Sequence, residues 1–168
     1  MKKGRALIGL PVLSEKEGQP LGRVMDILYS DNEGQIKGIL VETEGTSLPE
    51  MRFIQIANIK DISNEVVFID NKNSLQAPQC LKADSGDTSY STALLIGQHI
   101  YSELGKEQGM ITDVVLDFDK GIVNGYQISN GFIADLVNGR NVIPVGSVIT
   151  MGKDMIIVKE DIEKEGGR

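Results

Sequence analysis

Two segments of the chain repeat one sequence pattern at an offset of 87 residues. Residues 22–28, GRVMDIL, correspond to residues 109–115, GMITDVV, and the same offset carries Gly34 to Gly121. Matches on either side keep offsets of 88 and 89, so the copies drift only where loops are expected. Solenoid repeats span about 20–50 residues, whereas a period this long is the size of a small domain. The repeat therefore predicts two tandem domains of one fold.

The predicted domains are residues 1–72 and residues 93–168, the second with a charged C-terminal tail, and residues 73–92 form a polar linker. The linker contains Pro78 and Gly86 and has no sustained apolar period, which is typical of a linker. Each domain is small and therefore only marginally stable alone. Packing of the two domains against each other, or formation of a homodimer, would bury more apolar surface.

Short apolar and β-branched runs, separated by turn residues, predict an all-β fold. In the first copy these runs are residues 7–13, 21–29, 36–41, 52–56 and 66–69. Hairpin turns are expected at residues 31–34 and 119–121, where a glycine is available for positive φ. Long helical patterns are absent, and short helices are expected only in the linker and at residues 159–164.

Roughly five or six short strands in about 75 residues, with no helix to cover one face, predict a small closed or nearly closed β-barrel for each copy. Closure also removes exposed sheet edges. Gly38 and Gly125 fall inside strand patterns, where glycine permits a bulge or the close approach of a neighbouring backbone.

The order of these signals resembles the PRC-barrel domain, here in two tandem copies. Gly-x-apolar-x-Asp-apolar-apolar is followed by a turn glycine, a strand glycine and a strand that ends near Ile143-Pro144. The first copy departs from this pattern by having Gln55 where the second has Pro144. The residues that carry the motif are Gly22, Asp26, Gly34, Gly38, Gly109, Asp113, Gly121 and Gly125.

The resemblance implies a small barrel of roughly five or six strands in each copy. The family includes the cytoplasmic portion of the photosynthetic reaction-centre H subunit and the C-terminal domain of the ribosome-maturation factor RimM. Those settings share protein docking and assembly, with no common catalytic reaction. The resemblance thus supports the fold more strongly than the function.

Asp26 and Asp113 occupy matching positions in the two copies. They are either paired acidic contacts for a partner or metal, or carboxylates that accept backbone N–H bonds or face solvent. The matching placement favours a role in the fold. Asp113, Asp117 and Asp119 share strand parity, but they lack the spacing of a calcium loop and Asp119 falls in a turn. We therefore expect no metal and no cofactor.

His99 and Cys80 are the single histidine and the single cysteine of the chain. Neither lies in a nucleophile elbow, a catalytic triad or a CxxC motif, and no phosphate-binding loop is present. We therefore expect a protein that is not an enzyme. Lys2, Lys3 and Arg5 form a basic cluster at the N-terminus, which we interpret as a mobile, solvated end.

The net charge of −7, with an acidic excess in both copies, argues against direct nucleic-acid binding. No apolar run approaches the length of a membrane helix, and no secretory signal follows the N-terminus. We therefore expect a cytoplasmic protein that does not insert into a membrane.

The main hypothesis is an adaptor or assembly module that binds protein partners. The alternative is a factor associated with RNA processing or ribosome maturation. A Met-bearing apolar patch would favour the first hypothesis, and a basic patch the second.

Overall fold

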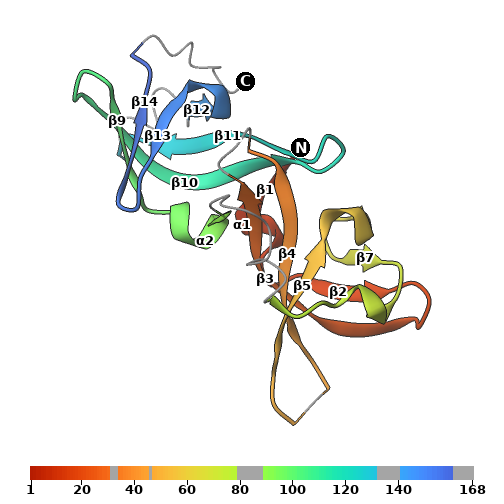
Figure 1. The fold of residues 1–168 in the computed structure, drawn as a ribbon. Coiled ribbons are helices and arrows are strands. Elements are labelled where there is room, and N and C mark those ends of the chain that lie inside the picture. The colour runs from red at the N-terminus through yellow and green to blue at the C-terminus, as the bar shows by residue number, and fades with distance from the viewer. Residues whose placement is uncertain (31–33, 46, 79–88, 132–140, 161–168) are drawn as a thin grey trace.

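The computed structural model describes residues 1–30, 34–45, 47–78, 89–131 and 141–160. Within these ranges the chain is built mainly of strands, which form two separate sheets of seven strands each. Figure 1 shows the sheets as two lobes, each built mainly from one half of the chain. The all-β expectation is therefore confirmed.

The first unit is a six-strand path with one strand added from elsewhere. Its strand order is β5-β4-β3-β2-β7-β6, antiparallel except for the parallel pair β2 and β7. The elements of the first unit are β2 (Pro11–Ser14), β3 (Gln19–Ser30), β4 (Ile36–Thr43), β5 (Met51–Gln55), the 3₁₀ turn η1 (Ile56–Asn58), β6 (Ile59–Ile62) and β7 (Val67–Ile69).

The second unit repeats this topology strand for strand. Its order is β12-β11-β10-β9-β14-β13, again with one parallel pair, β9 and β14. Each path is open: no ladder joins its two end strands within the described part of the chain. The elements are β9 (His99–Ser102), β10 (Glu107–Asp117), β11 (Ile122–Ser129), β12 (Asn141–Pro144), the 3₁₀ turn η4 (Val145–Ser147), β13 (Val148–Met151) and β14 (Met155–Val158).

The short helices differ from expectation. Leu7 was expected to begin a strand, but it ends the helix α1 (Gly4–Leu7), and β2 starts only at Pro11. The reason is a turn, in which Leu10 N–H bonds to the Leu7 carbonyl and Gly9 adopts a φ of 88°. Two further short helices are α2 (Thr92–Leu95) and η2 (Lys72–Ser74). No helix in the described ranges is long and apolar enough to cross a membrane.

Each unit receives its seventh strand from the segment that precedes the other unit. The strand β1 (Lys2–Lys3) pairs with β10, opposite Val115 and Leu116. The strand β8 (Ser89–Ser91) pairs with β3, opposite residues 28–30. The expectation of a mobile basic N-terminus is therefore wrong, because an edge of β10 holds Lys2 and Lys3. Residues 89–92, which we assigned to the linker, also belong to these exchanged elements.

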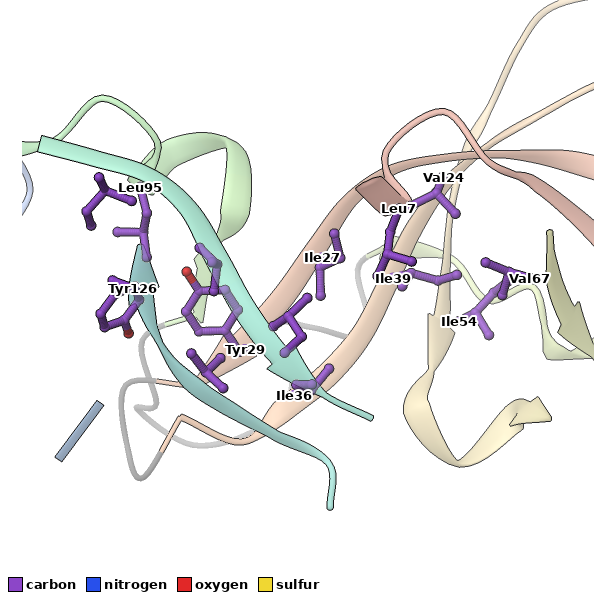
Figure 2. Close-up of a cluster of buried hydrophobic side chains, with 14 of the residues drawn as sticks. Leu7, Val24, Ile27, Tyr29, Ile36, Ile39, Ile54, Val67, Leu95 and Tyr126 are labelled. Atoms are coloured by element: carbon purple, nitrogen blue, oxygen red, sulfur yellow. The ribbon is translucent and has the colours of Figure 1, made fainter. Parts of the chain in front are cut away.

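A single hydrophobic core runs through both units. Fully buried side chains from the two sheets form one contiguous cluster, and Figure 2 shows its central part. Leu7 of α1 and Leu95 of α2 belong to it, as do Tyr29 of β3 and Tyr126 of β11, which are at most 2% exposed. The repeated units therefore pack as one body, which offsets the small core that each would have alone.

Candidate functional site

Asp26 and Asp113 lie at equivalent points of the two long strands β3 and β10. A β-bulge immediately precedes each aspartate and changes the direction of its side chain relative to the regular strand. Each carboxylate accepts a hydrogen bond at 2.8 Å from the next residue of its own strand, from the Ile27 N–H or the Val114 N–H. Asp113 is buried, and Asp26 is partly buried.

The second partner of each aspartate comes from the other unit. The Arg5 N–H in α1 donates to Asp113 Oδ1 at 3.0 Å, and the Ala93 N–H in α2 donates to Asp26 Oδ1 at 3.1 Å. The first N–H groups of a helix have no intrahelical acceptor and carry partial positive charge, so they favour a carboxylate. The two carboxylates thus bind the units to each other reciprocally.

Gly34 and Gly121 form a second reciprocal contact at the hairpin turns. The Ile36 N–H donates to the Gly121 carbonyl at 2.8 Å, and the Val123 N–H donates to the Gly34 carbonyl at 2.7 Å. Both glycines have positive φ, of 63° and 69°. The predicted turn at 31–34 otherwise lies outside the described residues.

The four remaining motif glycines lie inside strands at points of close backbone approach. A Cβ atom on Gly38 would overlap the Ile54 carbonyl oxygen, and one on Gly125 would overlap the equivalent oxygen of Ile143. Gly22 and Gly109 are similarly tight against β4 and β11, the neighbours of their strands. These glycines allow close strand packing, and they have no side-chain group that could bind or react.

The acidic residues that we considered as metal ligands do not form a cluster in the described part of the chain. Asp113 is occupied by backbone N–H groups, and Asp117 Oδ1 accepts from the Lys120 N–H at 3.0 Å. Asp119 lies in the exposed turn. Within the described ranges, no group of three or more His, Cys, Asp or Glu side chains is placed to hold a metal ion.

His99 lies on the exposed face of β9, and its Nδ1 is 2.8 Å from Glu107 Oε1. The ring is therefore paired with a carboxylate rather than with a hydroxyl nucleophile. Cys80 lies outside the described residues, as do half of the linker and the tail from residue 161.

The surface where the two units pack together, which we call the junction, is flanked by two hollows at equivalent positions of the repeat. The first, of about 140 Å³, lies between Ile56 and Ile59 of the first unit and Phe118 of the second. It also carries charge, since Lys60 and Asp119 belong to its lining. The second hollow has the same construction with the units interchanged.

This second hollow, which we call the junction groove, has a volume of about 260 Å³. Ser30 and Gly34 of the first unit form one side, and the η4–β13 segment of the second unit forms the other. Ile149, at the position equivalent to Lys60, is 48% exposed there. The lining consists of Ser30, Gly34, Tyr126, Val145, Gly146, Val148, Ile149 and Met151.

The junction groove carries no charged side chain among these lining residues. Burial raises the pKa of the Tyr126 phenol well above its usual range, so that group is neutral as well. At the nearby strand end, the Tyr90 hydroxyl donates to the Met151 carbonyl at 3.0 Å and fixes β8 against the second unit. The groove is therefore an uncharged hollow that exists only because the two units are packed together.

Comparison with known proteins agrees with this repeated architecture. The family model of the PRC-barrel domain matches residues 1–76 and again residues 87–164. The chain belongs to the PRC-barrel family. A relative from Bacillus subtilis (strain 168), named Uncharacterized protein YrrD, is 29% identical over 156 residues, which cover 89% of this chain and 83% of the relative.

The matching motif residues of the two PRC-barrel domains thus fall at their mutual junction and inside their sheets. Sequence reasoning found Asp26 and Asp113 from the repeat, but it did not find their partners in α1 and α2. The junction groove was missed as a set of residues, because its sides come from segments more than 100 residues apart. The one available signal was the isoleucine at position 149 where the first copy has Lys60.

Proposed function

We propose that this tandem PRC-barrel protein is a non-enzymatic, cytoplasmic assembly module that binds protein partners through the junction groove. The observation that supports this most is the uncharged groove with a half-exposed Ile149 at its rim. Protein-binding surfaces have an apolar centre depleted of charge. A phosphate backbone, in contrast, is bound by clustered Lys and Arg side chains, which this lining lacks.

A role without catalysis is supported by the arrangement of the titratable groups. Asp26 and Asp113 are used by backbone N–H groups, and His99 faces away on the outer surface of β9. A general acid or base works in a cleft, within reach of the substrate and of a nucleophile. The junction groove has neither an imidazole nor a carboxylate in its lining.

The test compares two exposed apolar residues of the second unit. Ile149→Glu places a charge in the groove, whereas Leu104→Glu places the same charge in the β9–β10 turn, where Leu104 is 76% exposed. Neither change buries a charge, so both variants should retain the wild-type circular dichroism spectrum. Tagged wild-type protein and both variants are then used to capture partners from cells that express the protein, with and without nuclease.

We expect at least one protein that wild type and Leu104→Glu capture equally, that Ile149→Glu loses, and that survives nuclease treatment. Equal capture by all three proteins would contradict the groove as the binding site. Loss of every captured protein on nuclease treatment would instead favour the alternative, a factor associated with RNA processing or ribosome maturation.

A further inference from the structure

A row of three side chains crosses the exposed face of the second sheet. Met110 of β10 lies directly opposite His99 of β9, and Met155 of β14 lies opposite His99 on its other side. Directly paired residues point to the same face, and neighbouring strands are about 4.8 Å apart. Met110 is 39% exposed, Met155 is 47% exposed and the His99 side chain is 53% exposed. Two thioethers therefore flank one imidazole on an accessible surface.

The imidazole is oriented by Glu107. The Nδ1 atom of His99 lies 2.8 Å from Glu107 Oε1, and a neutral ring in this pair donates its Nδ1 proton to the carboxylate. The lone pair is then on Nε2, directed away from Glu107. Metal-binding histidines typically have this arrangement, in which a carboxylate fixes the tautomer and makes the ring a better ligand.

We propose that Met110, His99 and Met155 form a binding site for copper(I), with Glu107 as a positioning residue. Thioether sulfur is a soft, polarisable ligand that selects copper(I), and imidazole completes a set of nitrogen and sulfur donors. Hard cations such as Ca²⁺ require oxygen ligands, which this row does not supply. The binding step is simple coordination and transfers no electron.

The first unit provides an internal comparison. At the equivalent positions of the same fold it has Arg23, Pro11 and Val66, with Pro20 in place of Glu107. Arg23 there pairs with a glutamate and with a backbone carbonyl. The fold therefore forms without the Met-His-Met row, so the row in the second unit is not a requirement of the sheet.

The test is a competition for copper(I) between the full chain and a chromophoric chelator under reducing, oxygen-free conditions. The chain carries Cys80→Ser, because a free thiol binds copper(I) by itself. Native mass spectrometry with silver(I) gives the stoichiometry independently. We expect one bound ion per chain. The Ile149→Glu variant should bind the same amount, because the proposed copper site is separate from the junction groove.

Leucine replaces methionine with little change of volume but removes the sulfur. We expect Met110→Leu and Met155→Leu each to weaken copper(I) binding at least about tenfold, and Glu107→Gln to weaken it about 10–100-fold. Met25→Leu is the matched control, since Met25 is 41% exposed on the first unit, and should leave affinity unchanged. Three results would overturn the site. These are equal affinity in all variants, an equal loss of affinity in Met25→Leu, and unchanged binding in a His99→Ala variant that keeps a native circular dichroism spectrum.

Discussion

At the scale of single residues, a carboxylate at a bulge is used here to join two halves of one chain. Asp26 and Asp113 each accept one N–H from their own strand and one from the opposite unit. Hydrogen bonds to a charged acceptor contribute about 1.5–3 kcal/mol each, more than bonds between neutral groups. The aspartate recurs in both copies because each unit uses it to bind a backbone N–H group of the other.

Asp113→Ala should lower the free energy of unfolding by about 2–3 kcal/mol, because it leaves the Arg5 and Val114 N–H groups without their acceptor. Asp26→Ala should cost less, because Asp26 is more exposed and water replaces the lost bonds. Urea titrations followed by circular dichroism measure both values. Asp119→Ala, in an exposed turn, is the control and should fall within about 0.5 kcal/mol of wild type. An effect of Asp113→Ala as small as that of the control would contradict this role.

At the scale of elements, the exchanged segments β1–α1 and β8–α2 meet at the junction. Gly4 and Thr92 occupy equivalent positions and face each other: a Cβ atom on Gly4 would lie 2.7 Å from Thr92 Cγ2. Thr92 is fully buried. Such an approach leaves room for one side chain only, so the two residues should be energetically coupled.

Gly4→Ala should destabilise the protein by about 1–3 kcal/mol, because the added methyl group overpacks the junction. The same change in a Thr92→Ala background should cost less than about 1 kcal/mol, because the conflicting atoms are gone. A double-mutant cycle of unfolding free energies measures this difference. Equal costs of Gly4→Ala in both backgrounds would show that the two segments do not meet.

The sequence predicted the long elements and missed the short ones for a physical reason. Residues 21–29 and 36–41 alternate or run apolar over enough positions to define β3 and β4. In contrast, β1 has two residues and α1 and α2 have four each, which is too few to show a period. Their conformation depends on β10 and β3 of the opposite unit, and no local pattern encodes such a long-range partner.

At the scale of the whole molecule, the tandem repeat behaves as an internal pair with approximate twofold equivalence. The exchanged strands, the two aspartates and the two turn glycines occur in matched, reciprocal contacts. The surfaces that differ between the copies are the ones to which we assign function. Ile149 replaces Lys60 at the groove, and the Met-His-Met row replaces Arg23, Pro11 and Val66.

Differential scanning calorimetry of the full chain tests the central claim, that the two PRC-barrel units form one folded body with one core. A shared core and exchanged strands predict one transition, with a calorimetric enthalpy equal to the van't Hoff enthalpy. Gly4→Ala should move that single transition to lower temperature without splitting it. Two resolved transitions, or a calorimetric enthalpy about twice the van't Hoff value, would contradict the account.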